Sequence, residues 1–186
     1  MAVAKFLVDK SAYWRIQQPL VASRLGPLLD QGLLGLCRIV EMEMLVSARN
    51  SVESDYIRGT FVGHERLTMP DEVWDRASEV QNALVGKGLH RKVGIPDLLI
   101  AATAERHGVT VLHYDKDFDR IAEVTGQAVE WVVPPGEADL PPQCTETGPE
   151  LLLRARFSTP HPSVGTTSAV RRSSPSGGSL SPCPEH

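Results

Sequence analysis

The sequence lacks the features that mark secreted, membrane-spanning and repetitive proteins. Its three cysteines, Cys37, Cys144 and Cys183, are odd in number and far apart, so they predict neither a disulfide framework nor a paired-cysteine metal site. No apolar run approaches the roughly 18 residues of a membrane helix, and the chain begins with a strand pattern rather than a charged and then apolar leader. No internal repeat is present. We therefore expect a soluble, cytoplasmic protein that is not exported and does not enter a membrane.

Aromatic residues and an excess of basic charge are also missing. Aromatic residues make up 5% and hydrophobic residues 41% of the 186 residues, which predicts an aliphatic core of ordinary size in one domain. The formal net charge of −4 argues against a generally basic coat for nucleic acid. It does not exclude an enzyme that acts on nucleic acid, because an acidic metal site contributes negative charge that bound ions offset.

Apolar periodicity ends near residue 139. In residues 140–186, 25 of 47 residues are Pro, Gly, Ser or Thr, and Leu151–Leu153 is the one apolar run. Such a segment cannot bury enough surface to offset the entropy lost on ordering. The sequence therefore predicts a folded domain over residues 1–139 and a disordered, low-complexity tail over residues 140–186.

The first 139 residues alternate between strand and helix patterns. Strands are predicted over Ala4–Val8, Leu33–Cys37, Val109–His113 and Val129–Val133. Helices are predicted over Ala22–Gln31, Val40–Asn50, Ser54–Phe61 and Pro70–Val85, from Pro96 to the cap Gly108, and over Phe118–Val124. Alternation of this kind requires crossover connections, so we expect an α/β fold whose mostly parallel sheet is covered on both faces. The binding crevice of such a sheet lies beyond the carboxyl ends of its strands.

Acidic residues follow several of these segments. The candidates are Asp9, directly after the first strand, Asp97, at the start of a helix that is apolar all round, and Asp115, Asp117 and Asp119, in the loop after Val109–His113. Asp9 is also suited to cap a helix, and Asp97 would interact favourably with its helix dipole. We retain Asp9, Asp97, Asp115 and Asp117 as site candidates and expect Asp119 to be exposed.

Helical geometry separates two glutamates in the segment Val40–Asn50. At about 100° per residue, the predicted apolar stripe consists of Ile39, Met42 and Val46. Glu43 lies on the flank of this stripe, and Asn50 falls on the same flank, whereas Glu41 points away from it. A glutamate beside the core-facing stripe can reach an interior crevice. We therefore expect Glu43 to belong to the site and Glu41 to be a surface charge.

Converging carboxylates repel one another unless a cation lies between them, and a hard divalent cation is the usual partner. Mg²⁺ or Mn²⁺ held by Asp9, Glu43, Asp97 and either Asp117 or Asp115 would activate a water and neutralise a phosphate. The pattern therefore predicts a metal-dependent enzyme acting on phosphates. No histidine is required as a base, and His113 is the histidine placed closest to these acids. Ser11 is expected to orient a ligand or a water.

Four segments resemble a known family. They are Phe6–Ala12, Glu43–Asn50, Pro96–Ala104 and His113–Phe118. Their order and spacing resemble the PIN-domain ribonucleases and, more narrowly, the VapC toxins of bacterial type II toxin–antitoxin systems. The resemblance covers roughly residues 1–137 and implies a PIN-like three-layer α/β/α sandwich. The family's acids would fall on Asp9, Glu43 and Asp97, with the fourth on Asp115 or Asp117.

The resemblance also implies an activity and partners. It implies Mg²⁺- or Mn²⁺-dependent endonucleolytic cleavage of RNA, often of tRNA. It also implies a cognate VapB-type antitoxin, whose C-terminal segment occupies the active-site groove. Finally, it implies a homodimer. The tail after residue 139 departs from the family pattern. The basic run Lys87–Lys92 directly precedes Asp97 and is the first place to test for contacts with RNA phosphates, since such contacts carry much of the affinity for nucleic acid.

Three other classes of protein compete with this interpretation. A phosphoaspartate receiver needs an acid pair after the first strand, but Lys10 follows Asp9. A haloacid-type phosphatase needs a second Asp two residues later, where Ser11 stands. A catalytically silent PIN-like module that binds RNA or protein is the non-enzymatic alternative. Such a module is expected to lack one or more carboxylates, and none is missing here.

Overall fold

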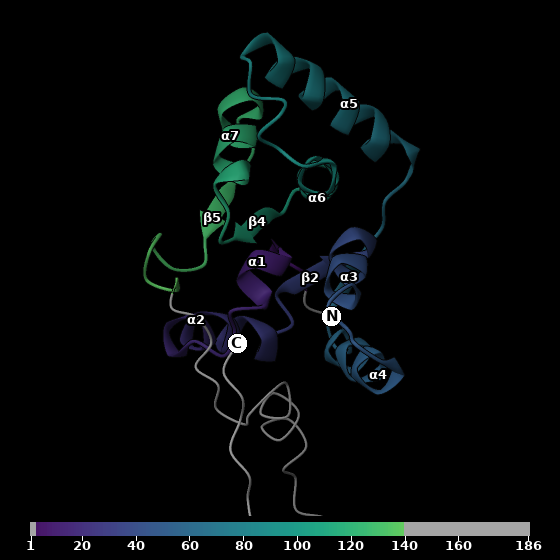
Figure 1. Cartoon of the computed structure of the whole chain (residues 1–186), viewed down its shortest axis with the longest axis vertical. Coiled ribbons are helices and arrows are strands. Elements are labelled where there is room, and N and C mark those ends of the chain that lie inside the picture. Colours follow the sequence, from purple (N-terminus) through teal and green to yellow (C-terminus); the bar gives the residue numbers. More distant parts are fainter. Residues whose placement is uncertain (1–2, 140–186) are drawn as a thin grey trace, which may run out of the picture.

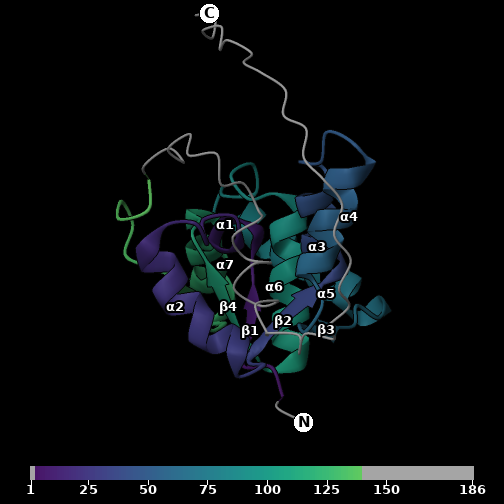
Figure 2. The ribbon, with the colours of Figure 1, turned by 90° about the horizontal axis from the view of Figure 1, so that it is seen from below.

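The computed structural model describes residues 3–139 (Figures 1 and 2). The strands of this range are β1 (Phe6–Val8), β2 (Leu34–Cys37), β3 (Glu65–Leu67), β4 (Thr110–His113) and β5 (Val129–Trp131). The helices are α1 (Lys10–Tyr13), α2 (Pro19–Asp30), α3 (Arg38–Leu45), α4 (Ser51–Thr60), α5 (Asp71–Gly86), α6 (Ile95–His107) and α7 (Lys116–Thr125). The predicted tail lies outside the described residues.

The strands form one sheet in the order β3-β2-β1-β4-β5, and each neighbouring pair is parallel. Figure 1 shows α5, α6 and α7 above the strands and α2 below them. The chain thus has the predicted three-layer α/β/α arrangement. Because all strands run in one direction, the segments that follow β1, β2 and β4 leave the sheet at the same edge. These segments contain Asp9, α3 and Asp115.

The core lies on both faces of the central strands. Leu7 and Val8 of β1 have no exposed surface, and neither do Val111 and Leu112 of β4. Helix α6 is buried almost all round, as predicted, since Leu98–Ala104 are each at most 3% exposed. Within residues 3–139, no helix is long and apolar enough to cross a membrane.

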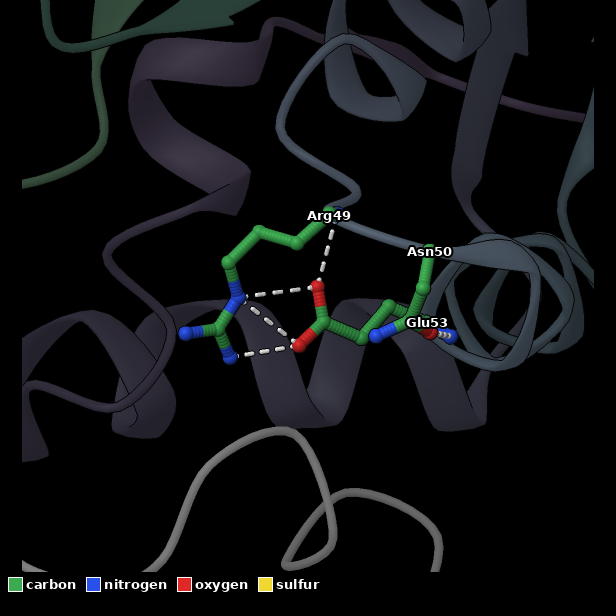
Figure 3. A network of polar contacts seen from close by, with 3 residues as sticks. All are labelled: Arg49, Asn50 and Glu53. Atoms are coloured by element: carbon green, nitrogen blue, oxygen red, sulfur yellow. Dashed lines mark hydrogen bonds and ion pairs between the residues drawn. The ribbon is translucent and has the colours of Figure 1, made fainter.

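Helix ends follow local chemistry. Pro19 begins α2 at a position where its missing N–H costs nothing. Gly108 caps α6 in the left-handed conformation at φ +65°, as expected, because only glycine adopts it without strain. Asn50 caps α4 by accepting a hydrogen bond from the Glu53 backbone N–H at 2.9 Å, and the Glu53 carboxylate accepts from the Arg49 backbone N–H at 2.8 Å (Figure 3).

Two parts of this region differ from the sequence prediction. The short edge strand β3 was not predicted, because its Glu-Arg-Leu sequence carries almost no apolar pattern. The helix predicted over Val40–Asn50 ends at Leu45, and Asn50 belongs to the next helix as its cap. Asn50 is therefore not on the flank of α3 that carries Glu43.

The apolar stripe predicted for α3 is also wrong. Met42 and Val46 are 57% and 83% exposed, whereas Val40, Glu41 and Met44 are buried. The helix begins directly after β2, and this start turns the positions of Val40 and Met44 toward the sheet. A period of 3.6 residues gives the spacing of a buried stripe, but packing selects which stripe is buried.

Candidate active site at the carboxyl edge of the sheet

Asp9 is held at the end of the central strand. It is 4% exposed and caps α1 by accepting a hydrogen bond from the Ser11 backbone N–H at 2.7 Å, so the capping role expected from the sequence is confirmed. Burial raises the pKa of Asp9, and hydrogen bonds from Ser11 and Lys10 oppose this rise. The Ser11 hydroxyl in turn accepts from the Tyr114 backbone N–H at 2.9 Å. Ser11 therefore joins the segment after β1 to the segment after β4, close to Asp9.

Asp97 reaches the same region from the first turn of α6. Its carboxylate accepts a hydrogen bond from the Gly94 backbone N–H at 3.1 Å. The pKa of Asp97 is raised to about 7, mainly by burial and then by the charges of Asp9, Asp115 and Asp117 in that order. A Cβ atom at position 94 would lie 2.9 Å from the Asp97 carboxylate. A side chain at position 94 would therefore displace the Asp97 carboxylate, and a sequence pattern alone did not indicate this constraint.

Glu43 is half-buried on α3 and faces the same charges. Burial raises the pKa of its carboxyl, Asp9 raises it further, and Lys10 opposes the rise. Cys37, at the start of α3, is fully buried, and burial raises the pKa of its thiol to about 11, with Asp9 and Glu43 adding to the effect. The thiol is therefore protonated at neutral pH and adds no negative charge to this edge.

Asp115 and Asp117 differ in their local roles. Asp115 is exposed and caps α7 by accepting from the Asp117 backbone N–H at 3.0 Å. Asp117 is half-buried and forms an ion pair with Arg120, while burial and Asp115 raise its pKa. Both charges act on Asp97, and Asp115 also acts on Asp9. Asp119 lies apart from them, because its carboxylate accepts from the Trp131 indole N–H at 3.1 Å.

Asp9, Glu43, Asp97, Asp115 and Asp117 are called the acidic cluster below. They come from four separate segments. Burial raises the pKa of four of them, and the charge of at least one neighbouring carboxylate raises each of these pKa values as a smaller cause. Among residues 3–139, no three His, Cys, Asp or Glu side chains already form a closed metal-binding group. Mg²⁺ retains several waters and needs only one or two direct carboxylates, so oxygen donors with unbalanced negative charge fit such an ion.

His113 is a packing residue. It is fully buried, with Phe118 and Trp131 at ring-centroid distances of 5.1 and 5.0 Å. Burial lowers the pKa of its imidazole, so the ring is neutral at pH 7. Its Nδ1 accepts from the Asp115 backbone N–H at 3.2 Å. His113 thus holds the backbone of Asp115 in place, and the expectation that no histidine acts as the base remains a prediction.

Glu41 is not the surface charge that the sequence predicted. It is 4% exposed, and its carboxylate binds Arg38 at 2.6 Å and Arg66 at 3.0 Å. A carboxylate is buried when cations and hydrogen bonds compensate its loss of hydration. Arg66 lies on β3, the strand that the sequence did not reveal. Glu41 therefore stabilises the outer edge of the sheet and takes no part in the acidic cluster.

Sequence comparisons identify relatives over the whole described domain. The PIN domain family matches residues 7–124. The chain is 53% identical over 136 residues to Ribonuclease VapC21 of Mycobacterium tuberculosis strain ATCC 25618 / H37Rv, covering 72% of this chain and 98% of that protein. It is 41% identical over 133 residues to Ribonuclease VapC18 of the same strain, covering 70% and 97%.

Solved structures share the fold. VapBC2 from Rickettsia felis, bound to a DNA fragment from its promoter, has a TM-score of 0.57 at 17% identity, covering 69% of this chain and 98% of that chain. DNA-bound VapBC from Salmonella typhimurium also has a TM-score of 0.57, at 20% identity, covering 70% and 99%. The chain therefore belongs to the PIN-domain family and, within it, to the VapC ribonucleases. The family resemblance and the fold class predicted from the sequence are confirmed.

Proposed function

We propose that this protein is the toxin of a toxin–antitoxin pair and cleaves RNA endonucleolytically with the help of Mg²⁺ or Mn²⁺, with tRNA as the expected class of substrate. The raised pKa values of the acidic cluster support this proposal most directly. Four carboxyl groups from separate segments have raised pKa values at one edge of a parallel sheet, and Asp97 reaches about 7. The curated relatives named above are ribonucleases, which gives the phosphate-directed chemistry an RNA substrate.

The acidic cluster would hold the metal. A divalent ion bound there supplies a water of lowered pKa and charge relief on the phosphate. Asp9 and Asp97 are the best positioned ligands, because each is fixed by a backbone N–H, at 2.7 and 3.1 Å. Glu43 completes the set from α3, and Asp115 and Asp117 share the fourth position. Ser11 orients Asp9 and takes no part as a nucleophile, since no base is paired with it in residues 3–139.

A VapB-type antitoxin is the expected protein partner. The solved structures of similar fold are VapBC assemblies, and another is described as a toxin–antitoxin complex from Klebsiella pneumoniae. Met42 of α3 and Val46, the C-cap of this helix, are exposed one turn apart, next to Glu43. An exposed apolar strip beside an acidic site suits a peptide with apolar and basic residues.

We also expect a homodimer, which light scattering of the full-length chain would detect as twice the monomer mass.

RNA binding would use positive charge close to the acidic cluster. The Arg120 guanidinium donates to the Lys92 carbonyl at 3.4 Å and pairs with Asp117. The basic run Lys87–Lys92 therefore ends next to an acid of the cluster. Charge reversal at Arg91, an exposed residue of this run, should weaken RNA binding and leave metal binding intact. Unchanged affinity for RNA would place the run outside the RNA path.

Cleavage of cellular RNA tests the function. Purified full-length protein would be incubated with total RNA in Mg²⁺, Mn²⁺ or EDTA, and new 5′ ends would be mapped. We expect discrete cuts that require a divalent ion and disappear in Asp9→Asn. Asp75→Asn is the matched control, because Asp75 is an exposed acid of α5 outside the acidic cluster. If wild type makes no cuts but binds RNA, the silent binding module becomes the better account.

A further inference from the structure

A cavity adjoins the acidic cluster between Arg15, which follows α1, the first turns of α7 and the segment that follows β5. Its volume of about 610 Å³ lies within the roughly 300–1,000 Å³ of small-molecule sites. Asp115 and Asp117 form part of its wall, and Pro135 and Gly136 form another part. Whatever binds in this cavity would therefore lie directly beside the proposed site of cleavage.

The charge of the cavity suits a phosphate once the acids are neutralised. Three cations, Arg15, Lys116 and Arg120, and three acids, Asp115, Asp117 and Asp139, line it. Arg120 pairs with Asp117, whereas no ion pair within residues 3–139 includes Arg15 or Lys116. Neutralisation of the carboxylates by a bound cation would leave these two positive charges facing the cavity without a partner.

Arg15 is held in place before any ligand binds. Its guanidinium donates to the Ser11 carbonyl at 2.8 Å and to the Ala138 carbonyl at 3.3 Å. It also lies 4.5 Å from the centroid of the Tyr114 ring. The Tyr114 hydroxyl accepts from the Gly136 N–H at 2.8 Å and from the Ala138 N–H at 3.0 Å. These contacts fix one wall of the cavity, so little conformational entropy is lost there on binding.

Trp131 supplies an aromatic surface at the same cavity. Its indole N–H donates to Asp119 at 3.1 Å, and its ring packs against His113 and, edge-on, against Tyr114 at 5.3 Å. The ring is thus immobilised, and its one polar group is already used. What it offers to a ligand is an apolar π surface, which stacks with any base and does not read its hydrogen-bonding edge.

We propose that this cavity binds one nucleotide of the RNA next to the scissile phosphate, with its base against Trp131 and its phosphate between Arg15 and Lys116. The inference rests on the proposed ribonuclease function and adds a subsite to it. The base of a nucleotide can stack on the aromatic surface of Trp131, and its phosphate can bind the two cations that form no ion pair, Arg15 and Lys116. The subsite would position the strand without selecting a particular base.

Tryptophan fluorescence tests the stacking contact. The full-length chain contains three tryptophans, Trp14, Trp74 and Trp131. Trp14→Phe with Trp74→Phe, with the acidic cluster intact, leaves Trp131 as the one reporter. A fluorescein-labelled 12-nucleotide single-stranded RNA with charged but non-hydrolysable linkages would be titrated with Mg²⁺ present, and its anisotropy would report binding independently. We expect quenching of Trp131 that saturates together with the anisotropy.

Two controls separate stacking from charge and from nonspecific effects. A chain that retains Trp74, an exposed residue of α5, in place of Trp131 should show no quenching. Inorganic polyphosphate should bind without quenching Trp131, because it has no bases. Equal quenching by polyphosphate would overturn the stacking contact, and so would RNA binding that leaves Trp131 emission unchanged.

Lys116→Gln tests the phosphate contact with the same non-hydrolysable RNA. Removing one such contact should lower the slope of log Kd against log salt by about 0.7. Lys5→Gln, an exposed lysine just before β1 at the opposite edge of the sheet, should leave the slope unchanged. Equal slopes for both variants would overturn the phosphate contact. Absence of RNA cleavage by wild type would instead overturn the proposed function, and the subsite with it.

Discussion

Asp9 and Asp97 lie in mutual electrostatic contact although 88 positions separate them in the chain. Both carboxyls are fixed by backbone N–H groups, and the charge of Asp9 contributes to the pKa of about 7 at Asp97. Two carboxylates held at a fixed separation repel each other more strongly as burial removes water between them. The metal-free protein is therefore destabilised at this edge, and the first two predictions measure that destabilisation.

Burial of Asp97, together with repulsion from the neighbouring acids, should make stability fall as pH rises. The folded protein retains a proton on Asp97 up to about pH 7, whereas an unfolded aspartate loses it near 3.8. Between these values the native state binds more protons than the unfolded state, so the free energy of unfolding decreases with increasing pH. Asp97→Asn should flatten this dependence and gain about 1–4 kcal/mol over wild type at pH 8. Urea unfolding in EDTA across pH 5–8 measures it, with Asp75→Asn as the control.

Parallel pH curves for Asp97→Asn and wild type would show that Asp97 titrates normally. The same experiment contains an internal check on the neighbours. Burial also raises the pKa of Asp9 and Glu43, so a smaller decline should remain in Asp97→Asn.

Mg²⁺ should reverse the destabilisation. A ligand that binds the native state at about 100 times its Kd adds about 2.7 kcal/mol, which thermal unfolding would detect as an increase in Tm. Asp9→Asn and Asp97→Asn should lose most of this increase, because each replaces a fixed carboxylate with a neutral amide. Calorimetric titration with Mg²⁺ gives the affinities directly. An increase in Asp97→Asn as large as in wild type would remove Asp97 from the metal site.

Glu41→Gln should lower the free energy of unfolding and leave Mg²⁺ binding unchanged. The change leaves Arg38 and Arg66 without their buried carboxylate, at an expected cost of about 1–3 kcal/mol. Glu79→Gln is the matched control, because Glu79 is 67% exposed and pairs with Arg76 on the surface of α5. That loss should be about 0.5 kcal/mol or less. Urea unfolding gives both values, and loss of the Mg²⁺-dependent increase in Tm in Glu41→Gln would contradict the structural role.

Tyr114→Phe should loosen the segment that closes the cavity. The hydroxyl accepts two backbone N–H groups, from Gly136 and Ala138, and both lose their partner in the variant. Hydrogen exchange followed by mass spectrometry should show faster exchange in peptides covering residues 134–139 and no change in α5. The rate of RNA cleavage should fall while Mg²⁺ affinity is maintained. Unchanged exchange at residues 136 and 138 would mean that other contacts hold this segment.

Much of the fold and most of the acidic cluster were predictable from local patterns. The strands β1, β2, β4 and β5 are apolar runs at the expected places, and Gly108 marks a helix end through its own backbone preference. Asp9, Asp97 and Asp115 were found because each directly follows a strand or opens a buried helix. Such signals depend only on neighbouring residues, so they can be recognised without knowledge of tertiary contacts.

The features that were missed depend on partners far away in the chain. Glu41 was assigned to the surface because its partner Arg66, which covers the buried carboxylate, lies 25 residues later, on a strand without an apolar pattern. The cavity beside the acidic cluster was also missed. It requires Arg15, Tyr114 and residues 134–139 to meet, which no spacing in the sequence indicates.

The amino-acid sequence by itself determined the order of the longer helices and of four of the five described strands, the positions of the acids at their ends and the family of the protein. Tertiary structure alone decided which face of α3 is buried, which acids repel one another and what lines the cavity next to them. The physical reason is that backbone propensity and hydrophobic period act over a few neighbouring residues. Burial and charge, in contrast, depend on every side chain that packing brings within reach.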